Sequence, residues 1–298
     1  MDGSAQIGDN PDNVVTNRQP SVQIWGVLNV TPDSFSDGGL HLQADAAVAH
    51  AERMLADGAD VIDVGGESSR PAGHAYGAGA ERVSEQEEIA RVVPVVRRIC
   101  ALGARVSIDT VKPGVARRAL DAGARIVNDV SCASSLELLG AVAEAGAEYV
   151  VMHNRGRGEV GGDNVVYADL VSDVVRALGD AVHRALELGV SREAIWLDPG
   201  LGFAKTPRQS LALLAHLDEL VALGHPVLVG PSRKLFVAAA APDAGGAAPS
   251  ANERLGGTAA AAALAVLAGV RAVRAHDVRE VRQAVRFTEA LLTERGAP

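Results

Sequence analysis

The segment Gly103-Ala-Arg-Val-Ser-Ile-Asp109 contains the pattern from which the fold of this chain can be predicted. A helix-like stretch precedes the glycine, a short apolar run follows it, and the run ends on a polar residue. Glycine just past a helix supplies the left-handed residue that closes the last turn. A short apolar run after such a glycine is typical of a buried parallel strand. The segment therefore predicts the junction between a helix and a strand.

The same unit recurs along the whole 298-residue chain. An eighth apolar run, residues 22–29, comes before the first unit and has no helix before it. Strands and helices are therefore expected to alternate from end to end. The glycines of the units are Gly58, Gly103, Gly123, Gly146, Gly189, Gly224 and Gly269. The helices are expected over residues 44–57, 85–101, 113–122, 136–145, 165–188, 209–223, 253–268 and 278–293.

This pattern predicts an α/β fold of the TIM (β/α)8 barrel type. Most of the runs end in Asn, Asp, His, Ser or Arg, so polar groups gather at one rim, where such a barrel keeps its chemistry. An open, doubly wound sheet uses the same units but concentrates its polar residues at one switch point. Here the polar ends are spread over nearly every strand, and the first turn, residues 29–39, lacks the dinucleotide-binding fingerprint. The closed barrel is the favoured architecture.

The domain organisation follows from the spacing of the units. The barrel is expected over residues 22–298, because the repeats run without a break that would hold a second domain. Residues 1–21 are polar and lack the apolar core of a signal peptide, so they are interpreted as a disordered N-terminal extension. Three glycine-rich stretches interrupt the rhythm and are either variable surface loops or lids at the rim: residues 72–82, 155–163 and 241–251.

Charge and composition exclude several kinds of partner. The net charge is −9, with 28 basic against 37 acidic residues, which argues against binding to nucleic acid or an anionic membrane. No apolar stretch is long enough to span a membrane. The two cysteines, Cys100 and Cys132, are not spaced for zinc or for a disulfide relay. A cytoplasmic protein with reduced thiols is expected.

Three carboxylates, Asp63, Asp109 and Asp198, stand at the ends of apolar runs, where they would be partly buried. Asn128 and Asp129 offer an amide and an acid at another strand end. A carboxylate can accept two parallel hydrogen bonds, and a buried one needs such a partner. Together these groups suit a heterocycle with neighbouring amino and ring N–H donors.

The basic residues lie late in the chain, in Ser232-Arg-Lys234 and Arg274-Ala-His276. The loops after the last two strands of such barrels commonly bind phosphate, so a leaving anion is expected there. Residues 202–206 resemble the tail of a nucleotide-binding loop but lack the glycine before Lys205, and that interpretation is rejected. His153 either lines the site or packs beneath it, and packing is favoured.

The chain resembles the dihydropteroate synthase family in segments that occur in one order over residues 22–293. These segments are Asn29-Val-Thr-Pro-Asp-Ser-Phe-Ser-Asp-Gly-Gly39, Asp63-Val-Gly-Gly-Glu-Ser-Ser-Arg-Pro71, Ser107-Ile-Asp-Thr110, Asn128-Asp-Val130, Asp198-Pro-Gly-Leu-Gly-Phe203, Ser232-Arg-Lys234 and Arg274-Ala-His-Asp-Val278. The resemblance implies that the protein joins 6-hydroxymethyl-7,8-dihydropterin pyrophosphate to para-aminobenzoate, with Mg²⁺ present, and releases pyrophosphate. It also implies a homodimer.

The resemblance assigns the site residues to three groups. The pterin is implied to contact Asp109, Asn128, Met152, Asp198, Phe203 and Lys234. The pyrophosphate is implied to contact Asn29, Arg274 and His276, with Asn29 also on the magnesium ion. The aminobenzoate is implied to contact Phe35, Ser69, Arg70, Pro71 and Ser232. The residues implied to act in catalysis are Asp109, Lys234, Arg274 and His276.

The sequence departs from the family pattern mainly around the aminobenzoate site. Ser69 stands where threonine is common, and the loop after Pro71 is longer than usual over residues 72–82. Sulfonamide sensitivity is therefore open. Two other functions are compatible with a pterin-binding barrel. One is methyl transfer from a folate to a corrinoid, which would not need Arg274, His276 and Lys234 around an anion. The other is a catalytically silent pterin-binding paralogue.

Overall fold

The computed structural model describes residues 21–31, 40–67, 83–155 and 165–296, and these contain an eight-stranded parallel sheet. Seven of the strands end within two residues of the polar residue that the sequence pattern gives for them, and β7 ends three residues before Ser232. The strands are β1 (Gln23–Asn29), β2 (Val61–Gly65), β3 (Arg105–Asp109), β4 (Ile126–Asp129), β5 (Glu148–Met152), β6 (Ile195–Asp198), β7 (Leu228–Val229) and β8 (Ala272–Ala275).

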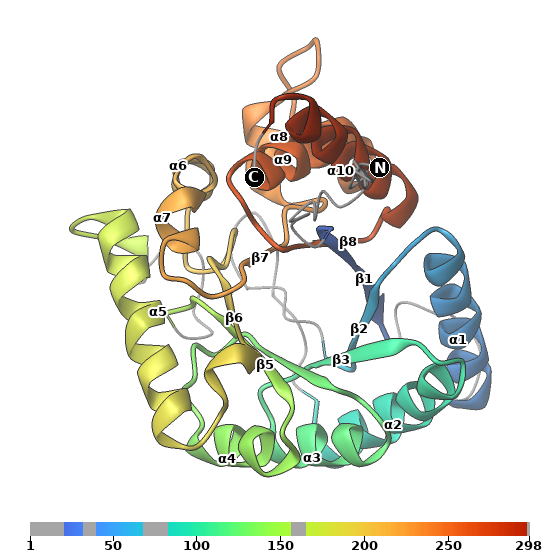
Figure 1. Cartoon of the computed structure of the whole chain (residues 1–298). Helices are drawn as coiled ribbons and strands as arrows, with labels where there is room; N and C mark the ends of the chain where they lie inside the picture. Colours follow the sequence, from blue (N-terminus) through green and yellow to red (C-terminus); the bar gives the residue numbers. More distant parts are fainter. Residues whose placement is uncertain (1–20, 32–39, 68–82, 156–164, 297–298) are drawn as a thin grey trace, which may run out of the picture.

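The strands form a ring, as the predicted barrel requires (Figure 1). They are paired in the order β6-β5-β4-β3-β2-β1-β8-β7. A parallel bridge between Leu197 and Val227 joins β6 to the residues just before β7. The amide of Leu197 also donates to the carbonyl oxygen of Pro226 at 2.9 Å. The prediction of a TIM (β/α)8 barrel is confirmed.

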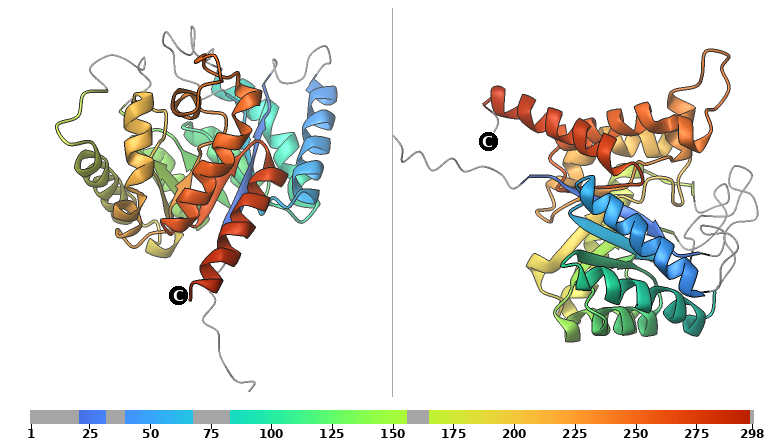
Figure 2. Two further views of the ribbon diagram at one scale, coloured as in Figure 1. Left: turned by 90° about the horizontal axis from the view of Figure 1, so that it is seen from above. Right: turned by 90° about the vertical axis from the view of Figure 1, so that its right-hand side faces the viewer.

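The helices lie outside the ring of strands (Figures 1 and 2). They are α1 (Leu40–Ala56), α2 (Glu85–Ala101), α3 (Pro113–Asp121), α4 (Leu136–Ala145), α5 (Leu170–Glu187), α6 (Pro207–Ala215), α7 (Leu217–Val221), α8 (Leu235–Ala240), α9 (Leu255–Leu267) and α10 (Val278–Glu294). The helix predicted over 209–223 is divided at His216, whose φ of −121° is not helical. Helix α8, directly after Lys234, was not predicted, and the start of the predicted 253–268 helix is a 3-10 turn, Ala251–Arg254.

The seven glycines that defined the repeated unit all have positive φ angles, from 59° at Gly146 to 115° at Gly123. This conformation is open to glycine and unfavourable for residues with a Cβ. At Gly123 a Cβ would also lie 3.1 Å from the Sγ of Cys100 on α2. The predicted role of these glycines in closing the helices is confirmed.

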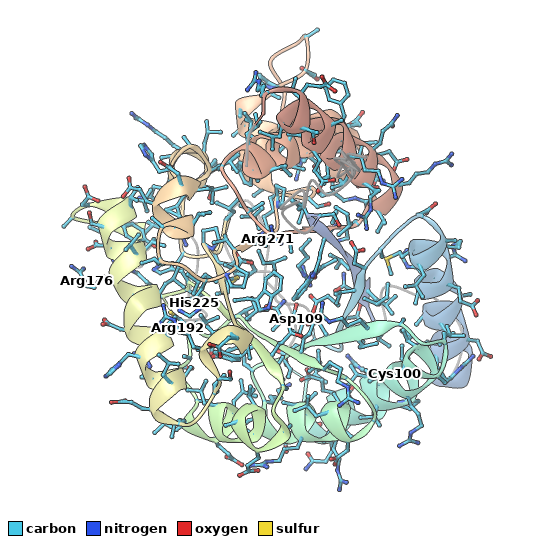
Figure 3. The ribbon with its side chains drawn as sticks, viewed as in Figure 1. Cys100, Asp109, Arg176, Arg192, His225 and Arg271 are labelled. Atoms are coloured by element: carbon cyan, nitrogen blue, oxygen red, sulfur yellow. The ribbon has the colours of Figure 1, made fainter. Side chains whose placement is uncertain are left out.

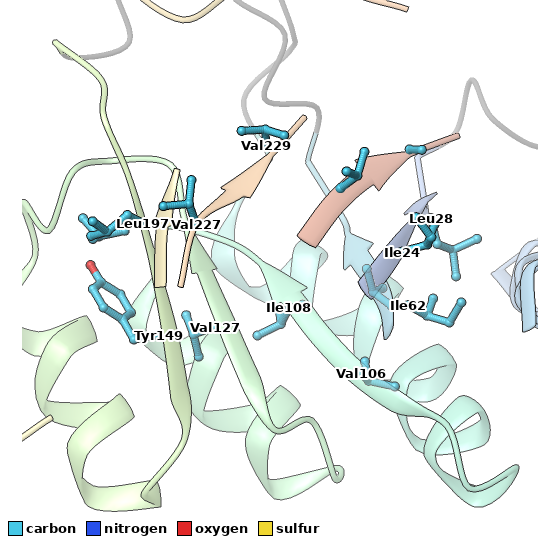
Figure 4. Close-up of a cluster of buried hydrophobic side chains, with 14 of the residues drawn as sticks. Ile24, Leu28, Ile62, Val106, Ile108, Val127, Tyr149, Leu197, Val227 and Val229 are labelled. Atoms are coloured by element: carbon cyan, nitrogen blue, oxygen red, sulfur yellow. The ribbon is translucent and has the colours of Figure 1, made fainter. Parts of the chain in front are cut away.

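Alternation along the strands separates two apolar layers. Side chains on the outer faces pack against the helices, and Figure 4 shows this layer from Ile24 on β1 to Val229 on β7. The inner faces form a separate cluster of Trp25, Val61, Ile126, Val150, Trp196, Leu228 and Ala272. The ring centroids of Trp25 and Trp196 lie 5.5 Å apart. These rings form an apolar floor inside the barrel, towards the amino ends of the strands. Polar groups above this floor are therefore shielded from the other end of the barrel.

Period-two alternation determines which residues lie above the floor. Two positions beyond Val61, Ile126, Trp196 and Ala272, the strands carry Asp63, Asn128, Asp198 and Arg274. The same inward face of β3 carries Ser107 and Asp109, because Val106 and Ile108 belong to the outer layer. The apolar floor and the polar layer above it are thus products of one sequence pattern.

Some predictions concern residues that the structure does not describe. The extension over residues 1–21 lies outside the described residues apart from Ser21, so the domain boundary stays a prediction. The stretches 72–82 and 156–163 also lie outside them. Residues 241–251 are described; they follow α8 rather than a strand, and most of them are exposed. No helix in the described ranges has the length and apolar character needed to span a membrane.

Candidate active site

An arginine joins two acidic residues inside the barrel. Arg274 on β8 donates from Nε to Oδ2 of Asp63 at 2.6 Å and from Nη2 to Oδ2 of Asp109 at 2.9 Å. Asp63 is fully buried and Asp109 is 8% exposed, so both carboxylates need this cation. Figure 3 shows Asp109 inside the ring of strands, whereas Cys100 lies at its outer side. The arrangement joins β2, β3 and β8 across the barrel.

Asn128 extends this group and leaves acceptors unused. Its Nδ2 donates to Oδ2 of Asp63 at 3.1 Å. Oδ1 of Asp63 and Oδ1 of Asn128 are buried, and neither has a hydrogen-bond partner among the described residues. Buried acceptors without partners are rare in folded proteins. Both atoms keep unused hydrogen-bond acceptor capacity beside Arg274 and Asp109.

Burial and the neighbouring charges affect Asp109 and Arg274 differently. Burial raises the pKa of Asp109 to about 7; the Arg274 guanidinium opposes the rise and the Asp63 carboxylate adds to it. Burial by itself would lower the pKa of Arg274, but Asp63 and Asp109 raise it further above its ordinary value. Arg274 therefore stays charged, while Asp109 changes charge near neutral pH.

A second acidic residue, Asp198, lies at the end of β6 beside a lysine. Its Oδ1 accepts from the amide of Gly200 at 2.7 Å, which fixes the carboxylate at the start of the turn. Burial raises the pKa of Asp198, and the Lys234 ammonium opposes that rise. Burial likewise lowers the pKa of Lys234 to about 8, opposed by Asp198.

Lys234 binds the turn after β6 and lies within electrostatic range of Arg274 on β8. Its Nζ donates to the carbonyl oxygen of Leu201 and lies 4.6 Å from the centre of the Phe203 ring. A Cβ built on Gly230 would lie 3.8 Å from Nζ of Lys234 and 3.8 Å from Cβ of Arg274. Glycine at this position therefore lets the two cations approach each other.

The loops after β7 and β8 are locked together at the rim. Oγ of Ser232 lies 3.0 Å from Nδ1 of His276, and the amide of His276 donates to the same oxygen at 3.1 Å. Arg233, at an uncommon φ of 60°, makes a two-point ion pair with Asp277 at 3.0 and 2.6 Å. Burial lowers the pKa of His276 to about 3, with Arg274 adding to the fall, so its imidazole is neutral near pH 7.

Asn29 and Met152 occupy two further strand ends. Asn29 ends β1, is exposed, and pairs in register with Gly65 of β2. Met152 is buried and pairs in register with Asp198. The ranges described contain no group of three or more His, Cys, Asp or Glu residues that could hold a metal. The amide oxygen of Asn29 suits a hard cation that takes its other ligands from water and phosphate, as Mg²⁺ does.

The structure thus brings most of the candidate residues to one rim. Candidates near the end of the chain, such as Arg274, lie at the same rim as Asp109, Asn128 and Asp198 of β3, β4 and β6. Four candidates for the aminobenzoate site lie outside the described residues: Phe35, Ser69, Arg70 and Pro71.

One acid considered from the sequence does not face the site. Asp129 accepts from Oη of Tyr149 at 2.6 Å and from the amides of Ser131 and Ala133 at 2.7 and 3.1 Å. It therefore holds the turn after β4, because its neighbour Asn128 takes the inward face of the strand. The suggestion that Asp129 adds an acid to Asn128 in the site is wrong.

Sequence reasoning also missed the role of Lys205. This residue was considered only as part of a phosphate loop, yet it is 1% exposed and lies 2.8 Å from Nδ1 of His153. The signal that could have found it is a lysine directly after a short glycine-rich turn that itself follows a buried acid. His153 is fully buried, in agreement with its expected packing.

Comparison with known proteins gives consistent results. A family described as "Pterin binding enzyme" matches residues 25–276. A dihydropteroate synthase from Mycobacterium leprae is 46% identical over 273 residues, which cover 91% of this chain and 94% of the relative. A Xanthomonas albilineans dihydropteroate synthase with 4-aminobenzoic acid has a TM-score of 0.81 at 39% identity, covering 91% of this chain and 93% of that one. The Xanthomonas albilineans enzyme in complex with 7,8-dihydropteroate has a TM-score of 0.78 at 36% identity, covering 91% and 94%.

Proposed function

The chain belongs to the pterin-binding enzymes as a member of the dihydropteroate synthase family, and we propose how its own residues carry out the reaction of that family. The reaction is a transfer in folate biosynthesis. It condenses 6-hydroxymethyl-7,8-dihydropterin pyrophosphate with para-aminobenzoate to give 7,8-dihydropteroate and pyrophosphate. The observation that carries the residue assignment is the hydrogen-bonded group of the buried Asp63, Asp109 and Asn128 with the partly exposed Arg274, in which two acceptors are unused.

The pterin binds through its edge and its face. Asp198 accepts the amino and ring N–H donors of the pterin, since a carboxylate takes two parallel hydrogen bonds. The unused oxygen of Asn128 accepts a further donor, and Asp109 lies beside it on the neighbouring strand. Lys234 contacts the electron-rich ring face, which favours a cation. Met152 and Phe203 supply the apolar walls.

The pyrophosphate binds at Arg274, His276 and Asn29. Arg274 presents a permanent cation, and the neutral imidazole of His276 supplies a hydrogen bond through the nitrogen that does not face Ser232. An anion bound near His276 raises its pKa, because nearby negative charge favours the imidazolium.

A magnesium ion would be held by the amide oxygen of Asn29 together with phosphate oxygens of the substrate. The donor set fits this ion, since magnesium is commonly bound by one or two protein oxygens and completed by water and phosphate. When bound there, the cation would neutralise charge on the departing pyrophosphate.

The reaction needs no covalent intermediate with the protein. The C–O bond between the pterin methylene and the pyrophosphate breaks, and its electron pair leaves with the pyrophosphate. The lone pair of the aminobenzoate nitrogen forms the new C–N bond, and that nitrogen loses a proton. Arg274, His276 and Lys234 stabilise the departing negative charge. Ser232, with Phe35, Ser69, Arg70 and Pro71, is proposed to receive the aminobenzoate and competing sulfonamides.

The proposed assembly is a homodimer through α9 and α10. These adjacent helices carry four of the nine exposed large apolar side chains of the described residues. They are Leu264, Leu267, Phe287 and Leu291, of which Phe287 is 73% exposed. Apolar side chains gathered on neighbouring helices of a soluble domain favour a protein contact.

The direct test is to incubate the protein with the pterin pyrophosphate, aminobenzoate and Mg²⁺ and to follow pyrophosphate release. Release should require aminobenzoate and should fall when a sulfonamide is added. A reaction without aminobenzoate would indicate hydrolysis of the pyrophosphate instead. Tight pterin binding with no release would identify a catalytically silent pterin-binding protein.

A further inference from the structure

Lys205 is a buried cation that the proposed mechanism does not use. It lies in the segment between β6, which ends at Asp198, and α6, which begins at Pro207. Only 1% of its surface is exposed. Lysine is almost never fully buried unless its charge is paired. Among the ion pairs found in the described ranges, none includes Lys205, so its partners are neutral groups. Such a residue needs an explanation beyond packing.

The contacts of Lys205 match the donors of an ammonium group. Its Nζ lies 2.8 Å from Nδ1 of His153, 3.1 Å from the carbonyl oxygen of Gly200 and 3.0 Å from that of Phe203. An ammonium has three N–H donors and no acceptor, so these three acceptors complete its hydrogen bonding. His153 then accepts at Nδ1 and carries its proton on Nε2.

His153 is suited to this role. Burial lowers its pKa to about 3, with the Lys205 charge adding to the fall, so the imidazole is neutral and can accept. Its Nε2 is buried and has no hydrogen-bond partner in the ranges that the structure describes. A buried polar atom left unpaired is unfavourable for folding. The arrangement is therefore retained against a stability disadvantage, which points to a functional reason.

The turn held by Lys205 presents two of the proposed pterin contacts. Gly200 donates its amide to Asp198 at 2.7 Å, while its carbonyl accepts from Lys205 at 3.1 Å. The carbonyl oxygen of Phe203 likewise accepts a hydrogen bond from Lys205, and its ring contacts the ammonium of Lys234. Ala204, between this turn and Lys205, has a positive φ of 48°, a conformation that persists in a non-glycine residue only where the surroundings enforce it.

Lys205 also acts on the charge of Asp198. Its positive field opposes the rise that burial causes in the pKa of Asp198, as do the fields of Lys234 and Arg274. Burial in turn lowers the pKa of Lys205 to about 7, and the Asp198 carboxylate opposes this fall. The other titratable groups that influence Lys205 are Lys234, Cys132 and Arg155. The lysine and the acid thus favour each other's charged forms.

We propose that Lys205, seated on His153, is a positioning residue for pterin binding: its ammonium holds the turn 198–203 in shape and keeps the Asp198 carboxylate charged. It touches neither the pterin nor the pyrophosphate. This inference rests on the proposed assignment of Asp198 and Phe203 to the pterin.

The test compares Lys205→Met, which keeps the length of the side chain and removes its charge, with Lys112→Met. Lys112 is the control because its ammonium is also paired internally, with Glu67 after β2 and with Glu88 on α2, away from the turn after β6. Pterin affinity is measured by calorimetry from pH 5 to 8, and thermal melting reports the folded state. Lys205→Met should bind pterin more weakly, on the order of 10- to 100-fold, as expected when a positioning group is lost.

The pH profile separates positioning from a merely structural role. Without the Lys205 charge, Asp198 becomes protonated at a higher pH. The pH at which pterin affinity is lost on acidification, the acid limb of the profile, should therefore be higher in Lys205→Met than in the parent. In Lys112→Met this pH should be unchanged. Equal affinity and an unmoved acid limb in folded Lys205→Met would overturn the inference.

A second variant covers the case in which Lys205→Met does not fold, and the parent protein tests the proposed function separately. If Lys205→Met does not fold, His153→Leu takes its place, because it removes one of the three acceptors and should move the acid limb in the same direction. An unmoved limb there overturns the inference. If the parent protein itself neither binds the pterin nor releases pyrophosphate, the proposed function fails independently of Lys205.

Discussion

Arg274 on the last strand donates to the buried carboxylate of Asp63 on the second strand at 2.6 Å, across the inside of the barrel. The resemblance assigns Arg274 to the pyrophosphate and Asp109 to the pterin, and it gives no role to Asp63. In the structure these groups share one hydrogen-bonded network, because Arg274 also donates to Asp109 at 2.9 Å. A change in the charge of one group therefore affects the others, and the two subsites are coupled.

Arg274→Ala should destabilise the protein and weaken the binding of both pyrophosphate and free pterin. Removing the cation leaves Asp63 buried without a charged partner, and breaking such a buried pair costs about 3–5 kcal/mol. Urea denaturation should report this loss, and calorimetry should show weaker binding of pyrophosphate and of free pterin. Arg271→Ala is the control, since Arg271 directly precedes β8, whereas Arg274 lies near the carboxyl end of the same strand. Unchanged affinity for free pterin would contradict the coupling.

Asp198→Asn should reduce pterin affinity strongly with little change in the fold. The amide can still accept from Gly200, but it loses the negative charge and one of the two acceptors that a pterin edge needs. Loss of a charged hydrogen bond of this kind corresponds to about 1.5–3 kcal/mol. Calorimetry with pterin gives the measurement, and Asp218→Asn on the exposed face of α7 is the control. Equal affinity in parent and variant would remove Asp198 from the pterin site.

Asp109→Asn should alter the pH dependence of stability. In the folded protein the pKa of Asp109 is raised to about 7, so between pH 8 and 6 the folded state takes up a proton that the unfolded state does not. Stability from this group therefore increases as pH falls through 7, by about 1 kcal/mol over this window. The Asn variant lacks the gain. Parallel free energies of unfolding from pH 6 to 8 in parent and variant would show that Asp109 does not titrate there.

The architecture could be predicted because it depends on local signals. Glycines such as Gly103 close helices, and apolar runs such as 105–109 form strands, whatever their partners are. The polar residues that end such runs, among them Asn128 and Asp198, are therefore predicted at one rim. Two features could not be predicted in this way. The binding of Arg274 to Asp63 joins residues 211 positions apart, and only closure of the ring brings them together. The burial of Lys205 could not be predicted because its partners are backbone carbonyl oxygens and a histidine 52 positions away.

Phe287→Glu should shift the oligomeric state toward the monomer. Phe287 is 73% exposed on α10, beside the apolar side chains of α9, and a carboxylate in a contact between two copies would be buried without a partner. Light scattering coupled to size-exclusion chromatography, over a range of protein concentrations, measures the change. Leu211→Glu on α6 is the control, because Leu211 is 45% exposed and lies on another helix. A parent protein that is monomeric at all concentrations would contradict the proposed homodimer.

Gly200→Ala should impair pterin binding through the turn that Lys205 holds. Gly200 has a φ of 66°, and an added Cβ would lie 2.0 Å from the carbonyl oxygen of His153, so the turn has to move. Movement would displace the amide that donates to Asp198 at 2.7 Å. Gly146→Ala is the matched control, because Gly146 has a similar φ of 59° and nothing within 4 Å of its added Cβ. The left-handed conformation alone costs about 1–2 kcal/mol for a residue with a Cβ, so both variants should lose that much stability. Only Gly200→Ala should lose more, and only Gly200→Ala should bind pterin more weakly. If both variants keep the parent's pterin affinity, the position of the Asp198 carboxylate does not depend on this turn.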